Sequence, residues 1–172
     1  MNEPAKIDGF TQAYITAALW SSSDYDFGPC PCCGKDAVLS HYPEPEFDQV
    51  PMCSDPGCGV VQIDNPDPLD QHYSQSDIGP ETLAKMIADC ARFQSEQGDT
   101  IRAAIETGEV KCGPDFDEWG RAGHDFWLTR EGHGAGFWDG DWSEEAGEKL
   151  TEASKAFGTF DLSVGSDGKI HH

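Results

Sequence analysis

Apolar residues recur at the 3.6-residue spacing of an α-helix in four stretches of the chain. The first covers residues 10–20, and Asp8 stands where its side chain can cap the first turn. The second covers residues 80–97, begins at a proline suited to a first helical turn, and carries the most regular apolar stripe. Residues 100–106 predict a short third helix, and the fourth begins at Ser143.

Strand-like patterns are concentrated in the last third of the chain. Residues 125–130 and 136–139 flank a glycine-rich segment at 131–134, which predicts a β-hairpin. Residues 159–164 predict a further strand, followed by a turn at 165–168 and a short terminal strand. This order of elements predicts an α+β fold, in which the helices pack on one face of a small antiparallel sheet.

Four of the seven cysteines form two closely spaced pairs. Two residues separate Cys30 from Cys33, four residues separate Cys53 from Cys58, and a glycine follows the second cysteine of each pair. This spacing predicts a zinc ribbon, in which the four thiolates hold one structural Zn²⁺ ion. Since all four ligands come from the protein, no coordination position is left open for a substrate.

The expected ribbon has short strands at 37–40 and 49–52 between its two cysteine pairs. Cys32 and His41 are alternative ligands, although the positions of proline and glycine favour Cys30 and Cys33 over Cys32. The ribbon is expected to be an insertion that interrupts a core domain, which gives segments at residues 1–28, 29–63 and 64–172.

The chain is strongly acidic, with 32 Asp and Glu residues against 11 Lys and Arg residues and a formal net charge of −21. The negative charge is spread over every segment and does not form a tail. Such a surface repels nucleic acid, because binding to phosphate depends on Lys and Arg displacing counterions. We therefore expect no direct binding of nucleic acid, even by the ribbon. The charge is either a solubilising surface or one that imitates nucleic acid or docks on a basic protein.

Neither a membrane-spanning run of apolar residues nor the apolar core of a signal peptide is evident in the sequence. Unpaired cysteines at metal-ligand spacing are typical of a reducing compartment. We therefore expect a cytoplasmic protein without a membrane partner.

The expected hairpin combines histidines, acidic residues, an arginine, aromatic residues and glycines within a short stretch of the chain. Its candidate functional residues are His124, Asp125, Arg130, His133 and Asp139. A histidine paired with a carboxylate is the arrangement used in general-base catalysis. No serine or cysteine nucleophile shares a motif with these residues, and the glycines do not form a phosphate-binding loop. The alternative is a structural hairpin with aromatic residues in the core.

Several segments resemble a family of short, mostly uncharacterised proteins of tailed bacteriophages and prophages. The resemblance lies in the Ala-Tyr…Ala-Leu-Trp-Ser-Ser opening within residues 10–22, the helix region at 73–93, the Gly-His-Asp-Phe-Trp-Leu-Thr-Arg segment at 123–130, and the ending at 160–170. Shorter members of that family lack the cysteine pairs, which implies that the ribbon is an insertion. The Cys-Pro-Cys-Cys-Gly start of the ribbon is similar to that of small phage restriction-alleviation proteins.

Charge and resemblance together lead us to expect a non-enzymatic, acidic phage accessory protein that binds a host or phage protein. A counter-defence inhibitor that imitates nucleic acid fits this description. Two alternatives remain open. One is a small enzyme that uses His124 and His133 with nearby carboxylates, and the other is a zinc-ribbon module associated with nucleic-acid transactions.

Overall fold

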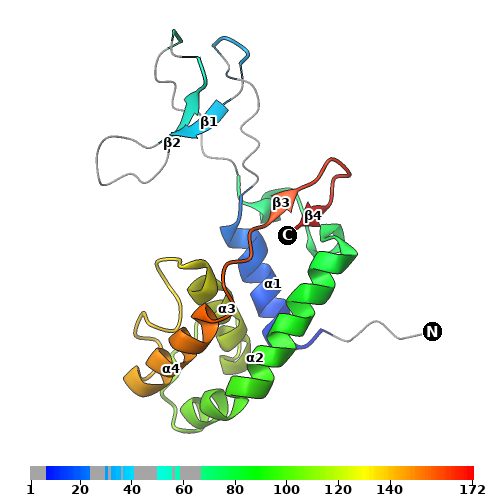
Figure 1. Cartoon of the computed structure of the whole chain (residues 1–172). Helices are drawn as coiled ribbons and strands as arrows, with labels where there is room; N and C mark the ends of the chain where they lie inside the picture. The colour runs from blue at the N-terminus through cyan, green and yellow to red at the C-terminus, as the bar shows by residue number, and fades with distance from the viewer. Residues whose placement is uncertain are drawn as a thin grey trace, which may run out of the picture.

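A computed structural model describes residues 7–23, 30, 32–35, 37–40, 50–55, 57–58 and 67–172. The described chain contains four helices, two short 3-10 helices and two antiparallel strand pairs (Figure 1). The helices are α1 (Gly9–Ser21), α2 (Pro80–Glu106), α3 (Glu118–Glu131) and α4 (Glu144–Lys155). The strands are β1 (Ala37–Ser40), β2 (Val50–Cys53), β3 (Ser163–Val164) and β4 (Ile170–His171), and the 3-10 helices are η1 (Leu69–Gln71) and η2 (Gln75–Asp77).

The core is formed mainly where α1 packs against α3. Asp8 caps α1 by accepting a hydrogen bond from the Thr11 amide at 2.8 Å, as its position predicts. The two helices approach so closely that a Cβ atom at Gly123 would overlap the carbonyl oxygen of Phe10. Glycine is therefore the residue that this crossing requires. Around it pack fully buried aromatic rings, among them those of Tyr14 and Phe126, whose centroids lie 5.2 Å apart.

Helix α2 is longer than its sequence pattern predicts, because the two expected helices at 80–97 and 100–106 are one continuous helix of 27 residues. Gly98 lies inside it and is buried. A single glycine costs a helix only about 1 kcal/mol, and Ile101 and Ala104 continue the buried stripe beyond it. Tertiary burial therefore outweighs the local breaking signal.

The expected hairpin at 125–130 and 136–139 is wrong, because residues 118–131 form α3. Asp117 caps this helix by accepting the Gly120 amide at 2.7 Å. Gly132 ends it in the left-handed conformation, with φ +73°, so the glycine that suggested a β-turn is a helix C-cap. The expected second strand lies in a loop between α3 and α4.

The strands are short, and the helices pack on one another more than on a sheet. Strands β1 and β2 pair from Ala37 opposite Cys53 to Ser40 opposite Val50, which confirms the two expected ribbon strands to within one residue. Strands β3 and β4 pair over two residues each, so most of the expected strand at 159–164 is unpaired. Helices together with small antiparallel pairs agree with the α+β class. No helix in the described ranges is both long and apolar enough to cross a lipid bilayer.

The chain leaves the helical core and returns to it at one point. The Leu69 amide donates a hydrogen bond to the Ser22 carbonyl at 2.8 Å, and Ser23 and Pro68 form an isolated antiparallel bridge. The preceding residue, Ser21, accepts a hydrogen bond from the Trp127 indole at 2.8 Å. These contacts form a stem that closes the segment containing β1 and β2, and Figure 1 shows those two strands beyond the end of α1.

Candidate metal centre

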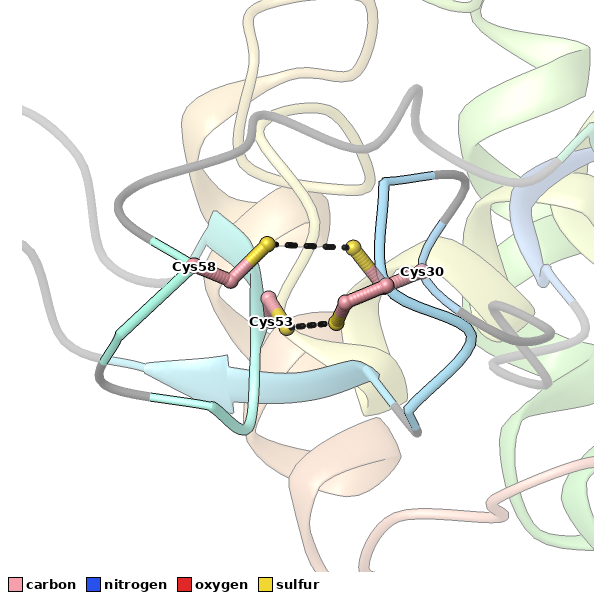
Figure 2. A group of neighbouring side chains, drawn as sticks. Cys30, Cys53 and Cys58 are labelled. Carbon is pink, nitrogen blue, oxygen red and sulfur yellow. Dashed lines mark hydrogen bonds between the residues drawn. The ribbon is translucent and has the colours of Figure 1, made fainter.

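The four predicted ligands converge at one end of the β1–β2 pair. The Sγ atoms of Cys30, Cys33, Cys53 and Cys58 all lie within 4.8 Å of one another. Cys30 and Cys58 Sγ are 3.9 Å apart, and Cys33 and Cys53 Sγ are 3.3 Å apart (Figure 2). Cys30 and Cys53 are buried, Cys58 is partly buried and Cys33 is exposed. The cluster is therefore open to solvent on one side.

The donor set and its spacing fit a tetrahedral metal ion. Four sulfurs bound at about 2.3 Å from a central ion lie about 3.8 Å from one another, which is close to the two sulfur–sulfur distances in the cluster. Thiolates that approach so closely repel one another unless a cation lies between them. The arrangement can therefore hold one thiolate-preferring metal ion with four protein ligands.

Backbone amides prepare the first cysteine pair for metal binding. The Gly34 amide donates to the Cys30 carbonyl at 2.8 Å, and Gly34 adopts the φ of +71° that this tight turn requires. The amides of Cys32 and then Cys33 donate hydrogen bonds to the Cys30 sulfur, which lowers the pKa of Cys30 to about 7. The thiolate that a metal ion needs is thus favoured at neutral pH.

The second cysteine pair uses Asp55 as its local scaffold. The Asp55 amide points to the Cys53 sulfur at 3.4 Å, and the Asp55 carbonyl accepts the Cys58 amide at 3.0 Å. Its carboxylate accepts the Gly57 amide and pairs with Lys35 Nζ at 2.7 Å. This ion pair joins the two cysteine turns directly.

Of the two alternative ligands, Cys32 and His41, the structure describes only Cys32. Cys32 is exposed and lies outside the group of four that converge, although its thiol is the largest cause of a raised pKa at Cys58. His41 lies outside the described residues. The four-cysteine set is therefore the one that the geometry supports.

The candidate residues of the expected hairpin do not form one site. Asp125 is fully buried, and its Oδ2 accepts hydrogen bonds from Arg121 Nε at 2.8 Å and Trp142 Nε1 at 2.7 Å. Its Oδ1 lies 2.8 Å from His124 Nδ1. Sequence reasoning missed Arg121 and Trp142, although Arg121 and Asp125 have the i,i+4 spacing of a helical ion pair.

Arg130 belongs to a second buried network one and a half turns along α3. Its side chain is 1% exposed and donates to the Tyr14 hydroxyl at 2.7 Å, to Asp89 at 3.1 Å and to the carbonyls of Phe157 and Gly158. The guanidinium therefore joins α1, α2, α3 and the segment after α4.

His133 and Asp139 lie in separate surroundings. His133 lines a cavity of about 480 Å³ together with Ser21 and Glu131. Burial lowers the pKa of His133. Asp139 accepts the backbone amides of Gly136 and Asp141, both at 3.2 Å, and thereby holds the turn that it belongs to. Of the five candidates, the structure brings only His124 and Asp125 into direct contact.

Comparison with known proteins identifies no relative. Neither a protein-family model, nor a curated protein, nor a solved structure matches the chain.

Replacing Asp125 by Asn should destabilise the fold by about 3 kcal/mol, because Arg121 would lose its one fully buried carboxylate partner and keep only the partly exposed Asp139 and Asp141. Asp99→Asn is the matched control, since Asp99 pairs with Arg102 but its side chain is fully exposed, and it should cost less than about 1 kcal/mol. Urea denaturation followed by circular dichroism measures both. Equal stability of the two variants would contradict a structural role for Asp125.

Proposed function

We propose that the ribbon holds one structural Zn²⁺ ion through Cys30, Cys33, Cys53 and Cys58. Four thiolates in a tetrahedral arrangement are the usual donor set of structural zinc. Zinc has no redox chemistry, which suits a site whose four coordination positions are all filled by protein ligands. When bound, the ion neutralises part of the thiolate charge and ties the two cysteine turns together. Two sulfur–sulfur distances of 3.3 and 3.9 Å, with all four sulfurs within 4.8 Å of one another, support this assignment.

We further propose that the protein acts without catalysis by binding a basic surface of another protein. The observation that carries this proposal is that the Lys and Arg side chains of the protein pair largely with its own carboxylates. Most basic side chains that the structure describes form ion pairs within the chain, namely Lys35, Lys85, Arg92, Arg102, Arg121, Arg130 and Lys169. Because the chain has 32 acidic residues against 11 Lys and Arg residues, these ion pairs leave a large excess of negative charge.

Such a surface attracts a basic partner over a long range and gives fast, salt-sensitive association. A large aromatic side chain can add a short-range contact, because Trp138 is 55% exposed. Exposed tryptophans surrounded by polar residues are frequent anchors of protein interfaces. The combination favours a protein partner over a purely solubilising role for the charge.

The class of partner follows from the same charge. A protein surface that normally binds nucleic acid is basic, and an acidic protein can occupy it by presenting carboxylates in place of phosphates. Together with the resemblance to phage proteins, this supports a counter-defence inhibitor that imitates nucleic acid in the cytoplasm of an infected cell.

A second candidate function is a small enzyme, and one observation favours it. The cavity lined by Ser21, Glu131 and His133 contains a histidine whose lowered pKa keeps it neutral, as a general base requires. However, the Ser21 hydroxyl already donates to the Ala17 carbonyl at 2.7 Å and accepts the Trp127 indole. Glu131 is similarly engaged, since it accepts the Phe160 amide at 2.7 Å. These groups support the packing of the core more directly than a reaction.

Freshly purified protein should carry one zinc ion per chain, as measured by native mass spectrometry and elemental analysis in chelator-free buffer. Cys53→Ser should lower the occupancy below about half an equivalent, because serine is a poor ligand for zinc. Cys112→Ser is the control, since Cys112 is exposed and outside the cluster, and it should keep the full equivalent. Zinc-free wild-type protein, or equal loss in the two variants, would contradict the site.

The immobilised protein should capture basic, nucleic-acid-binding proteins from a bacterial lysate, and both added duplex DNA and rising salt should release them. Salt acts because the Debye length shortens from about 10 Å at 0.1 M to about 3 Å at 1 M. The purified protein itself should not bind duplex DNA. A resin with an unrelated protein of similar net charge controls for general attraction.

A variant with His124→Gln and His133→Gln should capture the same proteins, because a binding function does not need either imidazole. Capture that is unaffected by salt and DNA, or identical to that of the control resin, would overturn the proposed function.

A further inference from the structure

Trp138 is exposed although two aromatic residues near it in the chain are buried. Phe137 is 1% exposed and Trp142 is 5% exposed, whereas Trp138 is 55% exposed. An indole of this size in solvent contributes little to folding, because most of its apolar surface remains in water. Phe137 and Trp142, one before and one after Trp138 in the chain, are thus packed in the core, whereas Trp138 is not.

Several hydrogen bonds hold this loop in place. The Thr129 hydroxyl accepts the Phe137 amide at 3.0 Å, and the Trp142 indole donates to buried Asp125 at 2.7 Å. Lys111 Nζ donates to the Gly140 carbonyl at 2.9 Å. Trp138 therefore stands on a loop whose anchors lie on α3 and on the segment that precedes α3. A partner that contacts the indole does not have to order the loop first.

A groove of about 450 Å³ lies between this loop and α4. Trp138 and Trp142 line it from the loop, and Glu144, Gly147 and Glu148 line it from the helix. The loop and helix approach closely, because a Cβ atom at Gly147 would lie 2.5 Å from the Phe137 carbonyl oxygen. The side chains that line the groove include two carboxylates and no basic residue.

We propose that this groove binds an arginine side chain from a basic segment of the protein partner, with the guanidinium over the Trp138 indole and paired with Glu144 or Glu148. This inference rests on the proposed function, because it assumes a basic protein as the partner. The groove combines two features that favour a guanidinium, an exposed tryptophan and two carboxylates among its lining residues.

Arginine fits better than lysine for a physical reason. The planar guanidinium stacks on an indole and pairs with a carboxylate through two parallel N–H groups, whereas an ammonium is a more strongly hydrated point charge. Charge complementarity also excludes a nucleic-acid occupant, since phosphate groups would face Glu144 and Glu148 without a cation in the groove lining.

A fluorescein-labelled tetra-arginine peptide tests the inference with the full-length protein, by fluorescence anisotropy at low ionic strength. Trp138→Ala should weaken binding about tenfold, because the cation–π contact is lost. Trp20→Ala is the matched control, with an equally exposed tryptophan outside the groove, and it should change affinity less than about twofold. Tetra-lysine should bind more weakly than tetra-arginine to the wild-type protein.

A charge-matched pair of variants separates the groove from general attraction. Glu144→Gln with Glu148→Gln should weaken tetra-arginine binding at least about fivefold, whereas Glu145→Gln with Glu152→Gln, on the same helix and outside the groove, should have a smaller effect. Circular dichroism confirms that each variant is folded. Equal effects of the two tryptophan variants, or of the two glutamate pairs, would overturn the proposal that the groove binds arginine.

The outcomes for the groove and for the proposed function can be told apart. If tetra-arginine binds equally to every variant, the groove is wrong while a basic partner stands. If wild-type protein fails to bind the peptide but captures proteins that DNA releases, only the groove is overturned. If both experiments fail, both proposals are wrong.

Discussion

Two charged side chains on the buried face of α3 must be neutralised within the protein. Asp125 and Arg130 have almost no exposed surface, and an unpaired charge in such a place costs several kcal/mol. Arg130 is satisfied by groups from α1, α2 and the segment after α4. Asp125 is satisfied by Arg121 and by the Trp142 indole. The positions of α1 and α2, of the segment after α4 and of the loop before α4 thus depend on these two networks.

The same networks connect the core to the surface on which the proposed function rests. Asp125 holds Trp142, and Trp142 fixes one end of the loop that exposes Trp138. The residues that suggested a catalytic hairpin therefore act as internal supports, and the side chains offered to a partner lie at some distance along the chain. Arg121 and Arg130 are both engaged in pairs within the protein, and the excess of acidic residues, 32 against 11 basic ones, remains.

Local signals predict some elements of this fold and fail for others. The predictions for α1, α4 and the convergence of the four cysteines are confirmed, because caps, apolar spacing and cysteine spacing act within a few residues. The prediction for α3 fails because its aromatic run and Gly132 are equally compatible with a hairpin, and contact with α1 decides between them. The Arg130 network could not be predicted, since Tyr14 and Asp89 are 116 and 41 residues away in sequence.

We propose that the ribbon and the helical core obtain their stability from different sources. A ribbon of about thirty residues buries too little apolar surface to fold alone, and structural zinc supplies about 10–16 kcal/mol in comparable small units. The helical core has its own buried cluster, and the Leu69 amide donates a hydrogen bond to the Ser22 carbonyl at the base of the ribbon segment. Hydrogen exchange before and after chelation tests this division most directly. We expect that amides of β1 and β2 lose protection while those of α2 and α3 keep it. Equal loss of protection in α2 and in β1 would contradict it, because the two parts would then share one cooperative core.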